Sequence, residues 1–177
     1  LKEWNSKNSD FDFSVLTEMA GKSKGFKSFM NVNDKRFMKP TSMENVIKEY
    51  IDTDLSRGEI VRLCLEGLAF DSRKTRELLE DLTDRKMNKI HIVGGGIKND
   101  LFCQMVANAN DKLVQTGPAE STAMGNIVTQ MISGGYLKDL NEAHDLIKNS
   151  IEIKTYTPED AYLWNDFYSI KSMEGTR

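Results

Sequence analysis

The sequence has 177 residues, of which 39% are hydrophobic, and 24 Lys and Arg against 27 Asp and Glu give a formal net charge of -3. This length predicts one domain with a core that needs no disulfide or metal, and the composition excludes disorder of the whole chain. The charges are mixed without a basic block, and no apolar run reaches 18 residues, so we expect neither nucleic acid nor a membrane as partner.

Residues 1–40 are the least regular part, and we interpret them as a lead-in from a longer parent chain, because the sequence begins with Leu1 instead of Met. A short helix over 13–20, closed by Gly21, is the one element predicted there. Residues 41–177 are predicted to be the folded domain. Cys64 and Cys103 fall among apolar neighbours in predicted helices, so we expect buried, reduced thiols and a cytoplasmic protein.

Two helices open the predicted domain. The first covers residues 41–51, and the second, long helix begins at Ser56, which forms a capping box with Glu59. Gly67 lies in the middle of the long helix, where glycine is unfavourable, and this predicts the close approach of another backbone. The second half of the helix, residues 73–86, alternates charges and is expected at the surface. One apolar stripe recurs at helical spacing along its length: Ile60, Cys64, Leu68, Leu78 and Leu82.

A strand, a helix and a second strand follow in that order, which predicts a parallel βαβ unit. The first strand covers residues 89–93, a helix begins at about Asn99, and the second strand covers residues 113–114. A helix starting at Pro118 is expected to turn four side chains inward and to stop at Gly134-Gly135. Those four are Ala123, Ile127, Val128 and Met131. Helices over 140–147 and 158–171 complete the chain.

Three consecutive glycines, Gly94, Gly95 and Gly96, separate the first strand from its helix. Without side chains, the backbone can approach a ligand closely, and the helix behind it offers a partly positive N-terminus to an anion. Asn99 stands where a helix cap or a polar ligand contact is placed. A tight turn without any ligand remains the alternative interpretation.

Two nucleotide-binding motifs can be tested against this turn. A P-loop needs a Gly-Lys-Ser/Thr ending, which the sequence lacks. A dinucleotide-binding fingerprint needs a third glycine where Asn99 stands, and an acidic residue where the second strand ends in Gln115-Thr116. Binding of NAD is therefore the weaker alternative.

A second motif of small residues covers 117–126. Its small side chains at 119, 121, 123 and 125 are predicted to press the helix against the glycine turn, and Glu120 and Thr122 are candidate caps. Neither His91 nor His144 has a Ser, Cys or carboxylate partner at a spacing typical of a catalytic pair. No catalytic residue and no metal site is expected in this chain.

Together the two glycine-containing motifs, residues 90–99 and 117–126 with Gln104 between them, resemble the C-terminal domain of the FGGY carbohydrate kinases. The segment Asp34-Lys35-Arg36-Phe37, with Pro40 and Met43, resembles one branch of that family. The resemblance implies a ribonuclease-H-like, actin-like ATPase domain: an α/β fold whose sheet contains a parallel βαβ unit flanked by helices. It also implies transfer of the ATP γ-phosphoryl group to a hydroxyl of a small ketose or polyol, with Mg²⁺ carried by ATP.

By this resemblance, Gly95 and Asn99 lie at the ATP site, with Gly94 and Gly96 as supporting candidates. The family's general base is an Asp from the earlier part of the enzyme, and no segment here resembles that motif. We therefore expect this chain to supply part of the ATP-binding wall and to be inactive alone, while the sugar binds mainly elsewhere. Asp111 stands where the family often has glycine, and Asp tolerates the left-handed conformation needed there. A non-catalytic binding domain of the same fold remains an alternative.

Overall fold

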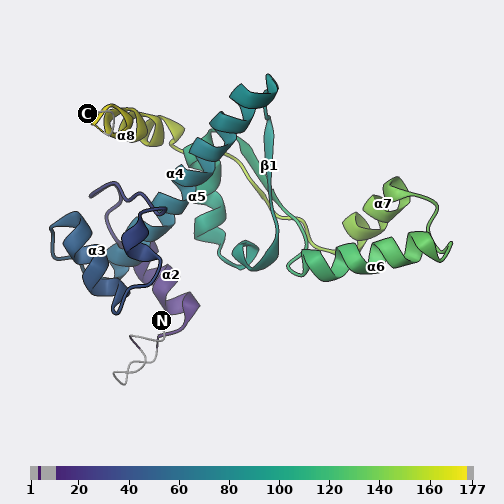
Figure 1. Cartoon of the computed structure of the whole chain (residues 1–177), viewed down its shortest axis with the longest axis horizontal. Helices are drawn as coiled ribbons and strands as arrows, with labels where there is room; N and C mark the ends of the chain where they lie inside the picture. The colour runs from purple at the N-terminus through teal and green to yellow at the C-terminus, as the bar shows by residue number, and fades with distance from the viewer. Residues whose placement is uncertain (1–3, 5–10, 175–177) are drawn as a thin grey trace. The chain divides into compact units, whose positions relative to one another are not determined.

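The computed structural model describes residue 4 and residues 11–174, with side chains up to residue 170. The chain divides into two compact units (Figure 1). Unit 1 comprises Leu1–Arg85 and Asp160–Arg177, and unit 2 comprises Lys86–Glu159. No helix in the described part of the chain is both long and apolar enough to cross a membrane. The boundary at residue 40 is a separate expectation about the parent protein and stays a prediction.

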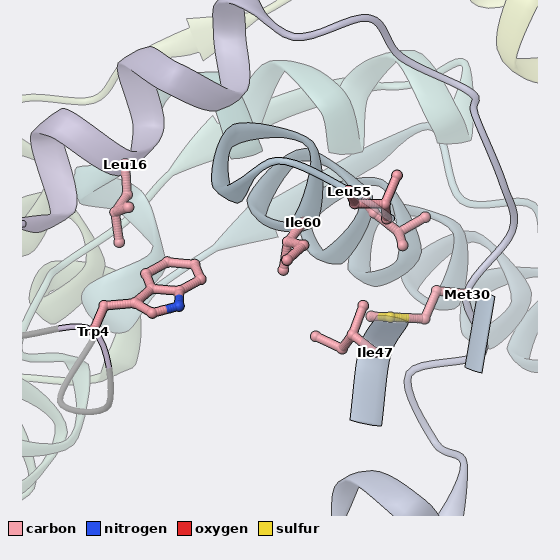
Figure 2. Close-up of a cluster of buried hydrophobic side chains, with 7 residues drawn as sticks. Trp4, Leu16, Met30, Ile47, Leu55 and Ile60 are labelled. Atoms are coloured by element: carbon pink, nitrogen blue, oxygen red, sulfur yellow. The ribbon is translucent and has the colours of Figure 1, made fainter. Parts of the chain in front are cut away.

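Every regular element described in unit 1 is a helix. Its elements are α2 (Phe13–Lys22), the 3₁₀ helix η1 (Lys35–Phe37), α3 (Met43–Ile51), α4 (Arg57–Thr83) and α8 (Ala161–Glu174). The four α-helices were expected from the sequence within a few residues, and η1 was not. Figure 2 shows one part of the core, where side chains from the lead-in, α2, α3 and α4 meet: Trp4, Leu16, Met30, Ile47, Leu55, Ile60 and Leu63.

Helix α4 begins with the predicted capping box, because the Ser56 side chain accepts from the Glu59 amide and the Glu59 carboxylate accepts from the Ser56 amide. Gly67 also behaves as predicted: an added Cβ would lie 2.9 Å from both the Met30 carbonyl oxygen and Val32 Cγ1. The lead-in backbone therefore crosses α4 at a point where only glycine fits.

The apolar stripe predicted for α4 is exposed beyond Gly67, which agrees with the surface position expected for residues 73–86 but not with the burial expected for Leu68. Leu68, Leu78 and Leu82 are 45%, 57% and 73% exposed, and Phe70 is the last buried hydrophobic residue described in α4, although Glu80 beyond it is 6% exposed. The second half instead carries ion pairs one turn apart, Arg73 with Glu77 and Arg76 with Glu80. Helical periodicity indicates which residues share a face, but it does not indicate whether another element covers that face.

Six aromatic rings join the lead-in, α4 and α8 within unit 1. Trp164 is 3% exposed and packs edge-on against Phe26, with ring centroids 5.0 Å apart, and against Phe70 at 5.1 Å. The cluster is completed by Phe29, Phe167 and Tyr168. The Arg73 guanidinium lies 4.3 Å from the centroid of the Tyr168 ring, which caps the cluster with a cation–π contact.

Glu66 is the most deeply buried charged residue described in unit 1, at 2% exposed. Its carboxylate accepts from Arg62 Nε at 2.6 Å and from the Phe26 amide at 3.1 Å. Phe26 has a φ of 57°, so this bond also holds a strained backbone position. Burial raises the pKa of Glu66, and the Arg62 and Phe26 contacts only partly oppose that rise.

The raised pKa of Glu66 gives a pH-dependent prediction. Because the folded state binds this proton more tightly than the unfolded state, Glu66 favours folding most below its ordinary pKa of 4.5, and this contribution is lost as pH rises through the folded pKa. The free energy of unfolding of the native chain should therefore increase relative to that of Glu66→Gln as pH falls from 7 toward 4.5. Urea denaturation of both proteins across this range measures it, and an opposite slope would contradict the assignment.

Unit 2 combines a small sheet with helices (Figure 1). Its elements are β1 (Lys89–Ile92), the 3₁₀ helix η2 (Gly94–Lys98), α5 (Asp100–Asn110), β2 (Leu113–Thr116), α6 (Ser121–Ser133), α7 (Leu140–Ser150) and β3 (Thr155–Tyr156). β1 and β2 pair in parallel, with Ile92 opposite Thr116, and this confirms the predicted βαβ unit. β3 adds to β2 in the antiparallel sense, giving the order β1-β2-β3.

Helix α5 ends as the sequence predicts. Asp111 adopts the left-handed conformation with φ 50°, and its amide caps the Ala107 and Asn108 carbonyls. Cys103 lies fully buried in this helix and Cys64 is half-buried in α4, and both carry free thiols.

Helix α6 differs from the prediction in its first residue and in which of its side chains are buried. It begins at Ser121, so Pro118 lies before the helix, and the Glu120 side chain makes no capping bond. Ala123 is exposed, Ile127 is 53% exposed, and an added Cβ on Gly125 would meet nothing within 4 Å. These small residues therefore do not press α6 against the glycine turn. The helix packs instead against α7, through a cluster built around Val128, Leu137 and Ala143.

Candidate functional site

The glycine turn lies at the carboxyl end of β1, where its first residue fixes the direction of the chain. Gly94 has a φ of +78°, and its amide donates to the Pro118 carbonyl at 2.9 Å. One residue away, the Gly117 amide donates to the Ile92 carbonyl at 2.8 Å, and an added Cβ there would lie 2.7 Å from Val93 Cγ1. Gly117 and Pro118, at the start of the second motif, thus hold the turn through two backbone hydrogen bonds. The close approach to Val93 that these bonds require is possible because Gly117 has no side chain.

Gly95 forms the open apex of the turn. An added Cβ would meet no atom within 4 Å, and the residue is exposed. The second amide of a 3₁₀ helix has no partner inside the helix, and no other described group accepts from Gly95. Of the three glycines, Gly95 therefore offers the backbone donor, while the Gly94 amide is already used.

Gly96 and Asn99 connect the turn to α5. The Gly96 carbonyl accepts from the Asn99 amide at 3.2 Å and lies 3.7 Å from Cys103 Sγ. The Asn99 side chain accepts from the Phe102 amide at 2.9 Å, so Asn99 is the N-cap of α5. The sequence allowed either a cap or a ligand contact at this position, and the structure shows the cap.

The contrast between two neighbouring glycines predicts different costs for the same substitution. Gly94→Ala forces alanine into a left-handed conformation and should lower the free energy of unfolding by about 1–2 kcal/mol. Gly95→Ala adds a methyl group in open space at a backbone position without positive φ, so it should cost less than about 0.5 kcal/mol. Chemical denaturation of both variants measures the difference, and equal costs would contradict this geometry.

A polar cluster beside the turn was not predicted from the sequence. Asp100, the first residue of α5, accepts from Lys154 Nζ at 2.8 Å and from the Tyr156 hydroxyl at 2.6 Å. These two donors lower the pKa of Asp100, whereas burial and the Asp100 carboxylate raise that of Tyr156. Tyr156 therefore stays protonated and donates throughout the physiological range. The Lys154 carbonyl also accepts from the Thr116 amide, and the Lys154 amide donates to the Thr116 hydroxyl, which places the cluster at the carboxyl edge of the sheet.

Gln104, which lies between the two glycine-containing motifs in the sequence, contacts the segment that follows β3. Its side-chain amide donates to the Thr157 carbonyl at 2.7 Å and to Asn108 Oδ1 at 2.8 Å. Asn108 Oδ1 in turn accepts from the Glu159 amide at 2.8 Å. Gln104 thus has a structural role on α5, away from the apex of the turn.

The family model for the C-terminal domain of the FGGY family of carbohydrate kinases matches residues 1–134. The chain belongs to this family. Among curated relatives, it is 36% identical over 156 residues to the rhamnulokinase of Bacillus subtilis and 37% identical over 164 residues to that of Bacteroides thetaiotaomicron. These matches cover 85% and 90% of the chain but only 32% and 34% of the relatives. The FGGY chain therefore spans about a third of the length of the rhamnulokinases it matches.

Solved structures agree on the fold. The glycerol kinase of Plasmodium falciparum, solved with ADP, matches 98% of this chain and 36% of its own with a TM-score of 0.65 and 19% identity. A xylulose kinase from Rhodospirillum rubrum matches 92% of this chain and 33% of its own with a TM-score of 0.63 and 16% identity. The predicted actin-like ATPase fold is thereby confirmed for this FGGY domain.

Proposed function

We propose that this FGGY domain forms part of the ATP-binding wall of a sugar kinase acting on a small ketose such as L-rhamnulose. The ketose assignment rests on the rhamnulokinases that share 36% and 37% of the aligned residues. The Asp34-Lys35-Arg36-Phe37 segment, which resembles that branch, forms η1, where Asp34 caps the turn and pairs with Arg36.

The observation that carries the proposal is the open apex at Gly95. Its amide has no acceptor among the described residues, and the space above its Cα is empty. A nucleotide phosphate or ribose oxygen is a suitable acceptor, and the absence of a side chain allows it to come close. Gly94 and Gly96 supply the shape of the turn in this account. Asn99 supplies the cap that presents the α5 N-terminus, and a direct contact of its side chain with ATP stays a prediction.

In the proposed reaction, a sugar hydroxyl oxygen bonds to the γ-phosphorus of ATP while the bond from that phosphorus to the β,γ-bridging oxygen breaks. ADP leaves, and the hydroxyl proton passes to a carboxylate base, which we place in the rest of the protein. Because phosphoryl transfer depends mainly on positioning and charge, a domain that fixes the nucleotide contributes without a catalytic side chain. This chain alone is then expected to bind nucleotide but not to catalyse phosphoryl transfer.

Mg²⁺ would arrive with ATP and balance the charge of its phosphates. Within the described residues, no three His, Cys, Asp or Glu side chains come together in a way that could hold a metal ion. The described residues of the turn offer a nucleotide contact through a backbone amide.

Two measurements test the proposal. Calorimetric titration of the chain should show binding of ADP and weaker or no binding of NAD, and the reverse order would support a dinucleotide-binding domain. In the full-length protein, a coupled ADP-release assay should favour L-rhamnulose over xylulose and glycerol. Binding of neither nucleotide by the chain, together with no kinase activity of the full-length protein, would support a non-catalytic binding domain.

A further inference from the structure

We propose that Tyr156 and Asp100 are positioning residues for the glycine turn, because their hydrogen bond ties the start of α5 to β3. This inference deepens the proposed function, which gives the turn its ligand. The two residues lie 56 positions apart in the sequence, and the bond between them is 2.6 Å long.

The turn is anchored on its two sides by different parts of unit 2. On the strand side, the Gly94 amide is bonded to the Pro118 carbonyl. On the helix side, the Gly96 carbonyl accepts from the Asn99 amide and lies within hydrogen-bond reach of the buried Cys103 thiol. The orientation of Gly95 between them therefore follows the position of the first turn of α5.

Asp100 holds that first turn from outside the helix. Its Oδ1 accepts from both Tyr156 and Lys154, and both donors come from the β3 region. The Lys154 ion pair is half exposed, with side-chain exposures of 49% for Lys154 and 63% for Asp100, so it contributes little alone. The Tyr156 hydroxyl is the better anchor, because its ring is half-buried and its bond to Asp100 does not require a long, flexible lysine side chain to be ordered.

The position of β3 in the sheet explains how this contact can fix the first turn of α5. Tyr156 pairs with Val114 in the sheet, and Lys154 is bonded to Thr116 at both its amide and its carbonyl. Because β1 and β2 are parallel, their carboxyl ends, the glycine turn and Lys154 lie at one edge of the sheet. The Tyr156–Asp100 bond thus transfers the rigidity of the sheet to the helix that carries the turn.

The test compares Tyr156→Phe with Tyr136→Phe, a matched control on an 80% exposed tyrosine of the same unit. In the chain without nucleotide, Tyr156→Phe should shift the amide resonances of Gly95, Gly96 and Asn99 and raise the hydrogen-exchange rate of the Asn99 amide, which is bonded to the Gly96 carbonyl, about three- to tenfold. ADP should then bind about three- to tenfold more weakly, while the melting of the chain stays cooperative. Tyr136→Phe should change none of these.

A second substitution separates positioning from a general loss of structure. Asp100→Asn retains an acceptor oxygen for Tyr156 and should show a smaller effect than Asp100→Ala, which should match Tyr156→Phe. Unchanged turn resonances and an unchanged Asn99 exchange rate in Tyr156→Phe would overturn the inference. Because these are measured without nucleotide, failure of the native chain to bind ADP would contradict the proposed function and leave the result on positioning intact.

Discussion

The substitution Gly95→Val is expected to weaken ADP binding by more than about 100-fold while leaving the domain folded. A β-branched side chain at the apex would occupy the open space above the Gly95 Cα and shield its amide, at a cost to binding of about 3 kcal/mol. No described atom lies within 4 Å of an added Cβ, so the free energy of unfolding should change by less than about 0.5 kcal/mol.

A graded series controls this experiment. Gly95→Ala adds only a methyl group and should cost ADP affinity less than Gly95→Val, with both variants as stable as the native chain. Calorimetry gives the affinities and urea denaturation gives the stabilities. If Gly95→Val binds ADP as well as the native chain does, the turn has no part in nucleotide binding.

The substitution Trp164→Ala is expected to lower the free energy of unfolding of unit 1 by about 3–5 kcal/mol. Trp164 is 3% exposed and contacts Phe26 from the lead-in and Phe70 from α4. Its removal leaves a cavity where three distant segments of the chain meet. Helix α8 lies outside residues 1–134, the part matched by the family model, so this result also tests whether the C-terminal helix belongs to the folded unit.

Tyr162→Ala is the matched control on the same helix, because Tyr162 is 63% exposed and should cost less than about 0.5 kcal/mol. Urea denaturation followed by far-ultraviolet circular dichroism measures both variants. Equal, small losses for Trp164→Ala and Tyr162→Ala would mean that α8 does not pack on unit 1 as described.

The βαβ unit was predictable because each of its parts has a local signal. The β-branched residues within 89–93, the three glycines and the capping Asn99 each specify their own conformation. The capping box of α4 and the close approach at Gly67 are likewise set by neighbouring residues or by one exceptional glycine.

Features that depend on distant partners were not predicted. β3 has only two residues, Thr155 and Tyr156, and no alternation identifies it; pairing with β2 creates it. The exposure of Leu68 and Ile127 could not be read from periodicity, because periodicity does not say whether another element covers a face.

The residues of the candidate site likewise divide into those with a local signal in the sequence and those that depend on a distant partner. The three glycines and Asn99 were singled out from the sequence, since glycine runs and caps have local meanings, and the family resemblance pointed to Gly95 and Asn99 among them. The sequence did not reveal that Pro118 already occupies the Gly94 amide. Asp100 and Tyr156 were missed, because their bond joins residues far apart in the chain. A carboxylate at the first position of a helix was the one available signal, and it is common at helix starts.

The most direct test of the central claim follows the backbone amides of the labelled chain by nuclear magnetic resonance during titration with ADP. The account predicts that the Gly95 amide shifts most, with smaller saturable shifts at Gly96 and Asn99, and with the same apparent affinity at all three. Shifts confined to residues outside 94–99, or no shift at millimolar ADP, would contradict it.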